Sequence, residues 1–359
     1  RMVVNPTLSH LPEISARFPR VSIVGVGDEG NGMVSSIFEG GGSGAQCIAV
    51  NTHKEPLEHV YSHEKVLIPC DVTGDSGERD DLEARETAIR ESARLMTPLL
   101  TGADIAFIVA KMKEGKAASV APLVADVARR SGAITIGMAT MPLPFERDDK
   151  LHAYHGLAKM RQSCHTVAIT SASRSIQSPR SLQNLSGDSP DIVVLDIVSG
   201  LAETLACPSA VNIDPAAFRL LMVHGGIAHV GIAHSSSPLR VEQATIAALR
   251  GPLLYDNVAR TRGVLLNVRG DQTLTVDEAE RAAELVAERV GWDIPVVMGA
   301  RIDESWSDGF QVSMLLTGGA YPYIPGGYRR LPLEMYEMDP DGEEEGSIDL
   351  QLDLDQLEE

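Results

Sequence analysis

The sequence is poor in cysteine, in long apolar runs and in positive charge, and each shortage excludes a class of protein. Its four cysteines lie far apart and form no CxxC pair, which favours reduced thiols in a cytoplasm over disulfides or zinc: Cys47, Cys70, Cys164 and Cys207. Ten histidines without ligand spacing predict no metal site. No apolar run could span a bilayer, and residues 1–20 lack the apolar core of a signal peptide. A net charge of -19 would repel phosphate backbones, so no nucleic acid partner is expected.

The negative charge is concentrated at the end of the chain. Twelve Asp and Glu residues and no Lys or Arg lie between Glu334 and Glu359. Because such a block buries too little apolar surface to offset chain entropy, residues 321–359 are predicted to be a disordered acidic tail. Apolar residues alternate with Asp and Gln in its last part, at Ile348, Leu350, Leu352 and Leu354. This period suits strand addition to a membrane-tethered partner, and a purely solubilising tail is the other interpretation.

The first part of the chain alternates strand and helix patterns. After an N-terminal extension at 1–20, helical periods predict a helix beginning near Gly32 and others at Glu83–Leu100, Ala117–Arg130 and Leu157–Cys164. Short apolar runs predict strands at Val21–Val26, Ala45–Asn51, Lys65–Pro69, Ile105–Ala110, Ala133–Thr140 and His165–Thr170. The alternation implies α/β architecture over residues 21–190, a parallel Rossmann-type sheet with helices on both faces.

A second, smaller domain is predicted to follow. A long helix at about Ile192–Ala206, within residues 191–210, would link it to the first domain. Residues 211–320 show the helical periods Arg240–Leu249 and Val276–Val290 and four strand patterns, at Gly225–His234, Gly263–Arg269, Pro295–Ala300 and Gln311–Thr317. These elements predict an α+β domain with a four-stranded sheet.

The stretch Ile105–Asp126 reads as a strand, a loop and a helix, which is where open α/β sheets bind ligands. Free N–H groups at the start of the helix would favour an anion such as phosphate. The expected loop, Lys111–Ser119, is nevertheless rich in lysine, with a single glycine at Gly115. The place therefore suits a phosphate, and the residues do not.

Several motifs together resemble FtsZ, the prokaryotic member of the tubulin superfamily. They include VSIVGVGDEGN, CIAVNTH, GADIAFIVAKM, NIDPAAF and FQVSMLLTGG, in matching order over roughly Val21 to Gly319. The resemblance implies the two-domain FtsZ fold, GTP binding in the first domain and head-to-tail polymers. It also implies a loop opening the second domain whose two aspartates activate the water that attacks the neighbouring subunit's GTP.

The glycine-rich loops of that family are altered here. Its GGGTGTG loop corresponds to residues 113–119, where Lys113, Gly115 and Lys116 stand among Glu and Ala residues. Side chains at these sites would fill the space through which backbone N–H groups reach a phosphate. Between Gly27 and Gly30, the acids Asp28 and Glu29 replace glycines. Two like charges about 4 Å apart cost roughly 4 kcal/mol at an effective dielectric constant of about 20, so acids facing a triphosphate would remove most of the affinity.

Other family positions are kept only in part. Asn51 and Thr52 match, but the acid that should follow is His53, and the family's AGAN motif is replaced by Glu78, Arg79, Asp80 and Asp81. The ribose-side residues Pro142, Phe145 and Glu146 match, whereas the basic position after them is Lys150, which loses bidentate geometry. Base-contacting positions fall near Ser171, Gly187 and Ile192, which are poorly suited to hold guanine.

The catalytic loop of the family is half present. Asn212 and Asp214 match, but the second acid is Ala217. Since a water is oriented and deprotonated by acceptors at fixed positions, no catalytic residue is expected. We expect Asp214 to cap the helix that follows, with Pro215 in its first turn.

Two functions from different classes fit these residues. The first is an FtsZ-like scaffold or regulatory protein of cell division or membrane remodelling that has lost GTP binding and acts through a second copy, as a dimer or filament, or through an active FtsZ relative. In it, Lys111, Lys113 and Lys116 would pair with the new acids across the former pocket, or both sets would be solvated. The alternative is a GTPase whose lysines bind phosphate and whose acids hold magnesium. Either protein would be cytoplasmic, recruited to the membrane by partners.

Overall fold

The computed structural model describes residues 18–41, 44–68, 82–113, 115–142, 147–171, 190–250, 260–304, 306 and 309–319. The predicted acidic tail and most of the N-terminal extension lie outside the described residues, as do Cys70, residues 78–81, Phe145, Glu146 and Gly187. Among the described cysteines, Cys47, Cys164 and Cys207 are free thiols. Within the described part of the chain, no helix is long and apolar enough to cross a membrane.

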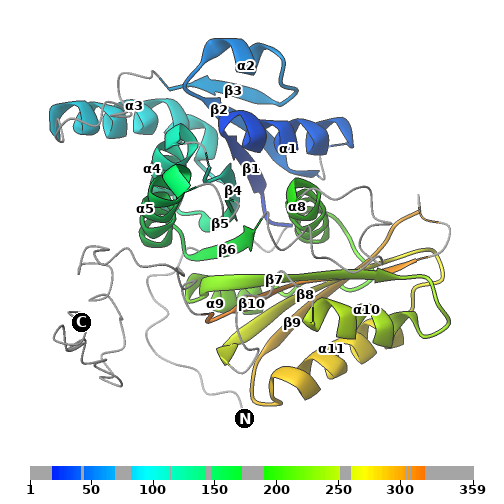
Figure 1. Ribbon diagram of the computed structural model, residues 1–359. Helices are drawn as coiled ribbons and strands as arrows, with labels where there is room; N and C mark the ends of the chain where they lie inside the picture. Colours follow the sequence, from blue (N-terminus) through cyan, green and yellow to red (C-terminus); the bar gives the residue numbers. More distant parts are fainter. Residues whose placement is uncertain are drawn as a thin grey trace, which may run out of the picture. The chain divides into compact units, whose positions relative to one another are not determined.

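One ten-stranded sheet carries the described residues (Figure 1). Its order is β3-β2-β1-β4-β5-β6-β7-β10-β8-β9. The strands are β1 (Val21–Val26), β2 (Gln46–Asn51), β3 (Glu64–Leu67), β4 (Ile105–Lys111), β5 (Ile134–Met141), β6 (Thr166–Ser171), β7 (Gly226–Ser235), β8 (Gly263–Gly270), β9 (Val296–Ile302) and β10 (Phe310–Thr317). The strands up to β7 are parallel, and β10 is antiparallel to both of its neighbours. The predicted α/β class and the second, four-stranded part are confirmed.

The two parts of the sheet are continuous, which the sequence did not predict. β6 pairs with β7 in parallel from Thr166 opposite Gly226 to Ile169 opposite His229. Backbone hydrogen bonds therefore join the predicted domains directly, in addition to side-chain packing. The predicted four-stranded sheet is present, but it extends the first sheet instead of standing apart.

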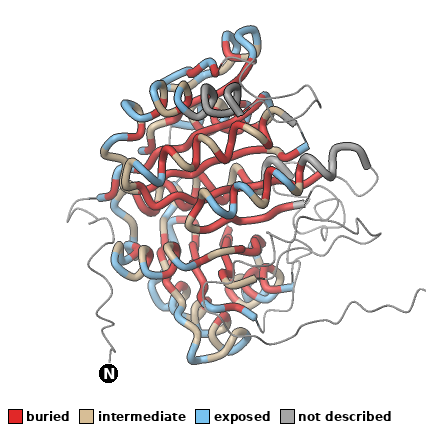
Figure 2. The backbone as a smooth tube through the Cα atoms, turned by 90° about the vertical axis from the view of Figure 1, so that its left-hand side faces the viewer, coloured by how far each residue is buried: buried red, intermediate tan, exposed pale blue. Residues whose placement is uncertain are grey.

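Helices cover both faces of the sheet. They are α1 (Gly27–Glu39), α2 (Lys54–Glu58), α3 (Leu82–Leu100), α4 (Gly115–Arg130), α5 (Arg147–Ser163), α8 (Pro190–Ala206), α9 (Pro215–Val223), α10 (Arg240–Leu249) and α11 (Val276–Val290). Residues of α1, α8 and α9 share one apolar core on one face, whereas α3, α4 and α5 pack on the first part of the opposite face. The strands and inner helix faces are buried, as expected for a largely parallel sheet (Figure 2).

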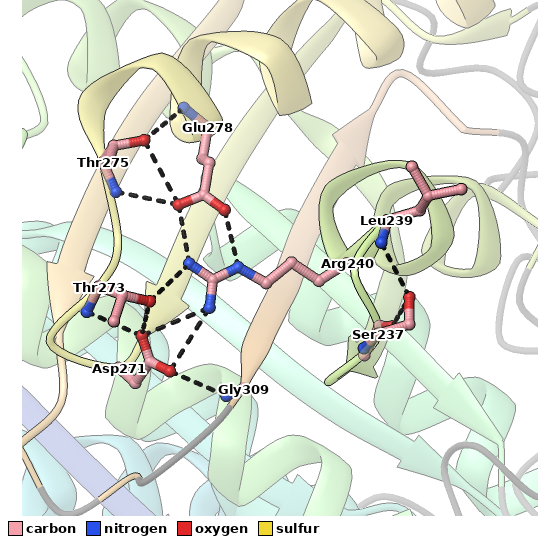
Figure 3. Close-up of polar contacts among 9 residues, drawn as sticks. Ser237, Leu239, Arg240, Asp271, Thr273, Thr275, Glu278 and Gly309 are labelled. Atoms are coloured by element: carbon pink, nitrogen blue, oxygen red, sulfur yellow. Dashed lines mark hydrogen bonds and ion pairs between the residues drawn. The ribbon is translucent and has the colours of Figure 1, made fainter.

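A cluster of polar side chains joins α10 and α11 beside the end of β8 (Figure 3). Arg240, at the start of α10, donates from Nε and Nη2 to the two carboxylate oxygens of Glu278 at 2.7 and 2.9 Å. Its Nη1 lies 3.4 Å from both oxygens of Asp271, and Nη2 donates to Thr273 at 3.0 Å. Glu278 also forms a capping box with Thr275 at the start of α11. One arginine thus ties two helix starts to a strand end.

Candidate functional site

The candidate nucleotide site lies where β1, β2 and β4 end and α1, α2 and α4 begin. Helix α1 starts at Gly27, immediately after β1, so the expected start near Gly32 is wrong. Gly27 has a positive φ of 78°, which favours glycine. A Cβ on Gly25 would lie 2.4 Å from the carbonyl oxygen of Gly30, and a Cβ on Gly30 would lie 2.5 Å from that of Val109. These glycines are therefore required for α1 to pack closely on β1 and β4.

The two acids that replace family glycines occupy the first turn of α1. Asp28 and Glu29 lie at its positive end, where carboxylates are favourable. Oδ1 of Asp28 accepts a hydrogen bond of 2.7 Å from Nδ2 of Asn51, at the end of β2. Oδ1 of Asn51 in turn accepts from the backbone N–H groups of Thr52 and His53, at 2.7 and 3.1 Å. A carboxylate in the first turn of α1 is thus hydrogen-bonded to the end of β2.

Lys111, the last residue of β4, forms an ion pair with the second acid, Glu29. The lysine side chain is 17% exposed and that of Glu29 is 36% exposed, so the pair is partly shielded from solvent. One of the ion pairs anticipated at the candidate site is therefore present. Its possible partners among residues 78–81 lie outside the described part of the chain.

The other two lysines are placed differently. The loop expected at Lys111–Ser119 is wrong in its extent, because α4 already begins at Gly115. Lys116 lies in the first turn of α4, and its Nζ is 3.1 Å from Nε2 of His53. Lys113 is exposed in the turn between β4 and α4. A lysine of α4 and a histidine from the segment between β2 and α2 are therefore in contact at the start of α4.

Alanines in the first turn of α4 serve packing. Ala117 and Ala118 are both buried, and a Cβ added to Gly156 of α5 would lie 2.7 Å from the Cβ of Ala118. Helices α4 and α5 thus approach closely at the position where the family loop has glycine and threonine. The residues that match the family's ribose-side motif are placed as follows. Pro142 is buried, Lys150 lies on α5, and Glu146 is outside the described residues.

One residue missed from the sequence, Asn31, holds the start of α1 against the end of β2. Asn31 of α1 is fully buried, donates to the carbonyl of Val50 at 3.0 Å and accepts from the Val50 N–H at 3.0 Å. It thereby ties α1 to the backbone of β2 through two hydrogen bonds. The available signal was an asparagine on the apolar side of a helix, directly after the glycines.

One residue that matches the family's catalytic loop, Asp214, caps α9. Oδ1 of Asp214 accepts from the Ala216 N–H at 3.0 Å, and Pro215 occupies the first turn of α9, which confirms the predicted cap. Asn212 accepts from the Ser209 N–H at 3.0 Å, and Ala217 packs against the core. Helix α9 ends beside the amino end of β6, whereas α1 and α4 begin at carboxyl ends of strands. Among the described residues, the side chains of Asn212 and Asp214 form hydrogen bonds to the backbone of Ser209 and Ala216.

The comparisons with known proteins decide the family. The Tubulin/FtsZ family GTPase domain matches residues 20–176, and the FtsZ family C-terminal domain matches residues 226–320. Cell division protein FtsZ 2 from Methanocaldococcus jannaschii is 32% identical over 311 residues, which are 86% of this chain and 82% of that protein. The chain belongs to the FtsZ family. The predicted resemblance is thus confirmed, and the protein is a member of a cytoskeletal cell-division family.

Other members of the family agree with this assignment. Cell division protein FtsZ 1 from Thermococcus kodakarensis is 29% identical over 340 residues, 94% of this FtsZ-family chain and 89% of that protein. A solved empty FtsZ dimer from M. jannaschii superposes with a TM-score of 0.74 at 28% identity, covering 84% of this chain and 88% of that one. CetZ2 from Haloferax volcanii, solved as a GTPγS-bound protofilament, shares the fold with a TM-score of 0.64 at 20% identity over 85% and 95% of the chains.

Among the described residues, no group of three or more His, Cys, Asp and Glu side chains is placed to hold a metal ion. The polar and charged side chains of the candidate site contact one another across the ends of β1, β2 and β4. They consist of Asp28, Glu29, Asn51, His53, Lys111 and Lys116.

Proposed function

We propose that this FtsZ-family protein assembles without GTP, because its own side chains fill the candidate nucleotide site. The Lys111–Glu29 ion pair is the observation that carries the proposal. A phosphate site needs donors and positive charge that remain available to the ligand. Here Glu29 uses the charge of Lys111, whose side chain is 17% exposed, and Asp28 adds a second carboxylate at the start of α1. A triphosphate would have to displace the first group and face the second.

The loss of the second catalytic acid supports the same proposal. Hydrolysis in the family needs two carboxylates from the loop that opens the second domain, and this chain has Asp214 and Ala217. The remaining carboxylate is engaged in capping α9. The residues that match the binding loops and those that match the catalytic loop are thus both altered in the direction that the proposal requires.

Equilibrium binding of labelled GTPγS, with and without magnesium, tests the proposal. CetZ2 from Haloferax volcanii serves as the positive control, since it was solved with that nucleotide. We expect no binding by this protein at ligand concentrations up to about 1 mM, which corresponds to less than about 4 kcal/mol of affinity. A dissociation constant of about 1 μM would overturn the proposal.

A double variant, Asp28→Gly with Glu29→Gly, tests the physical reason. It removes two negative charges and releases Lys111, so its affinity for GTPγS should exceed that of the natural chain. Glu284→Gln with Glu288→Gln removes two exposed acids on α11 and is the matched charge control. If the double variant binds no better than the natural chain, the acids are not what excludes the nucleotide.

A second candidate function rests on the approach of Lys116 to His53 at the start of α4. Under it, these two bases bind a phosphate in place of the glycine loop, with magnesium, and the protein is an atypical GTPase. Binding of GTPγS that disappears in Lys116→Met and persists in Lys54→Gln with Lys65→Gln would select this function over the first.

Assembly is the activity that we propose for the chain in cells. A second copy or an active FtsZ relative is the proposed partner in the cytoplasm, and residues 334–359 are the proposed attachment to a membrane-tethered partner. Because no nucleotide would lie at the contact between subunits, dimers or filaments should form equally with and without GTP. Analytical ultracentrifugation of the full chain measures this, and assembly that requires GTP would contradict it.

A further inference from the structure

The strands from β5 to β9 begin next to one another along the amino ends of the sheet, whereas the candidate nucleotide site lies at carboxyl ends. Backbone hydrogen bonds join neighbouring starts. The N–H of His165 donates to the carbonyl of Thr135 at 3.0 Å, and that of Gly226 donates to His165 at 3.2 Å. The N–H of Val264, in β8, donates to the carbonyl of Pro295, just before β9, at 2.9 Å. Side chains on the turns before these strands therefore lie along one end of the sheet.

Helices that lead into these strands end in arginine. The last turn of α4 carries Arg129 and Arg130, that of α5 carries Arg161, and that of α11 carries Arg289. All four are exposed. Arg129 donates from Nη1 to the carbonyl of Gln162 at 2.8 Å, which places it beside the end of α5. Because positive charge is favourable at helix C-termini, the helix dipoles account for the position of these arginines.

Cations from different helices come close to one another here. Burial, followed by the charges of Arg129, His224 and Arg219, lowers the pKa of His165 to about 4. His224 caps the end of α9 and is exposed. Nδ1 of His165 accepts from the Thr135 N–H at 3.0 Å. Bases from α4 and α9 thus act on the same histidine at the start of β6.

Acids on the same turns offset part of this charge. Asp126 pairs with Arg130 at 2.8 Å, and Glu288 lies 3.5 Å from Arg281. Asp293 is exposed in the turn before β9. Charges more than about 8 Å apart are largely screened at about 0.15 M salt, so the net charge of the whole chain does not set the potential here. The local charge depends on the helix-end arginines and these few acids.

Two large apolar side chains are exposed at the same end of the sheet. Trp292, in the turn between α11 and β9, is 71% exposed, and Leu220, on α9, is 57% exposed. Helix α9 lies beside that turn, because a Cβ on Gly263 would stand 2.2 Å from Cδ1 of Leu221 and 3.4 Å from Cγ of Pro295. Helix dipoles do not account for exposed apolar groups. Tryptophan is favoured where an apolar phase meets water.

We call Arg129, Arg161, Leu220, Arg289 and Trp292 the amino-end patch, and we propose that it binds the surface of an anionic lipid bilayer. Guanidinium groups form paired hydrogen bonds with phosphates, and the apolar side chains would enter the headgroup layer. Charge and apolar insertion together give stable attachment where either alone is marginal. A soluble anion would leave Trp292 and Leu220 in water, so the combination favours a bilayer. The proposal is independent of whether the candidate nucleotide site binds GTP.

Co-sedimentation of the full chain with vesicles tests the proposal. Vesicles of phosphatidylcholine alone are compared with vesicles of phosphatidylcholine and phosphatidylserine in equal parts. We expect binding to the anionic vesicles only. It should weaken between about 0.01 M and about 1 M salt, because the Debye length falls from about 30 Å to about 3 Å. Equal binding to both kinds of vesicle, or binding to neither, would overturn the proposal.

The variant Arg129→Gln with Arg161→Gln removes two cations of the patch. Its affinity for the anionic vesicles should fall about 25-fold, at roughly fivefold per arginine. The control, Lys54→Gln with Lys65→Gln, removes two exposed cations on α2 and on β3, an edge strand of the sheet, and should bind as the natural chain does. Circular dichroism checks that both variants are folded. A folded patch variant that binds as tightly as the control contradicts the assignment.

The emission of Trp292 reports the contact without changing the patch. Trp306, the other tryptophan of the chain, is replaced by phenylalanine, so that Trp292 is the only source. Anionic vesicles should shift its emission to the blue, and lipids brominated on their acyl chains should quench it. Unshifted and unquenched emission from bound protein would assign the contact to another surface. Association without vesicles that is lost in Arg129→Gln with Arg161→Gln would assign the patch to a second copy, and either result overturns the proposal.

Discussion

Replacing Arg240 by methionine should destabilise the second part of the body. The side chain of Arg240 is 13% exposed and that of Asp271 is 6% exposed, so the substitution leaves a carboxylate shielded from water without its cation. Glu278 loses a two-pronged contact of 2.7 and 2.9 Å. The methionine retains most of the apolar stem, so the change measures the charge contacts and not a cavity.

The size of the destabilisation depends on the hydrogen bonds that the carboxylates of Asp271 and Glu278 retain. Breaking a fully buried ion pair costs about 3–5 kcal/mol. Asp271 still accepts from the Thr273 N–H at 2.9 Å, and Glu278 still accepts from the Thr275 N–H at 3.0 Å. We therefore expect a loss of about 2–3 kcal/mol in the free energy of unfolding and a fall of about 5 °C in Tm.

The dependence on pH gives a second test of the same contacts. Hydrogen bonds from Thr273 lower the pKa of Asp271, with a further contribution from Arg240, and the hydrogen bonds from Arg240 lower the pKa of Glu278. Their contribution to stability is present above the carboxyl pKa values of the unfolded chain and is lost as the pH falls through the lower folded values. The difference in the free energy of unfolding between the natural chain and Arg240→Met should consequently become smaller at acid pH.

Urea unfolding, followed by circular dichroism from neutral to acid pH, measures both effects. Arg281→Met is the matched control, because Arg281 contacts Glu242, Glu284 and Glu288 from an exposed position on α11. Exposed pairs contribute little, so this variant should stay close to the natural chain. The reasoning is refuted if Arg240→Met costs no more than Arg281→Met, or if its cost is unchanged in acid.

Three further predictions concern the first part of the body and α9. Gly30→Ala should cost about 3 kcal/mol or more in thermal unfolding, because the new Cβ would meet the carbonyl of Val109, whereas Gly32→Ala has open space and should stabilise by up to about 1 kcal/mol. Asp214→Ala should lower stability by about 1 kcal/mol through loss of the cap, without changing assembly in sedimentation; a change in assembly would show that Asp214 contacts a second subunit. The pKa of His165, lowered to about 4, makes the natural chain lose stability as the pH falls from about 6.5 through 4, and His165→Asn should flatten that slope in urea titrations.

The parts of the fold that the sequence predicted well are those set by local pattern. The helices Arg240–Leu249 and Val276–Val290 and the strand Val21–Val26 have the predicted bounds, because apolar spacing alone determines them. The start of α1 was misplaced because its glycines, which suggested a turn, serve close packing on Val109 instead. Local pattern cannot distinguish these two uses of glycine.

The features that could not be predicted are contacts between residues that are distant in sequence. The pairing of Thr166 with Gly226 depends on which strand edges meet after folding, and no periodicity encodes it. Which residue Lys111 or Lys116 contacts depends on the length and direction of the side chains. Lys111 pairs with Glu29, and Lys116 contacts His53. The order of strands and helices around the candidate site could therefore be predicted from the sequence, whereas the contacts among its side chains required coordinates.

The position of β10 has a consequence for synthesis of the protein. The last described strand to leave the ribosome is inserted between β7 and β8, pairing with both over its full length. Until Thr317 has emerged, one edge of β7 has no strand to pair with. The pair β8 and β9 is not yet joined to β7 through the sheet. A nascent chain must keep these edges away from other polypeptides while residues 236–317 are being translated. Chains cut short before Phe310 should accordingly aggregate, and chaperones should be needed late in elongation.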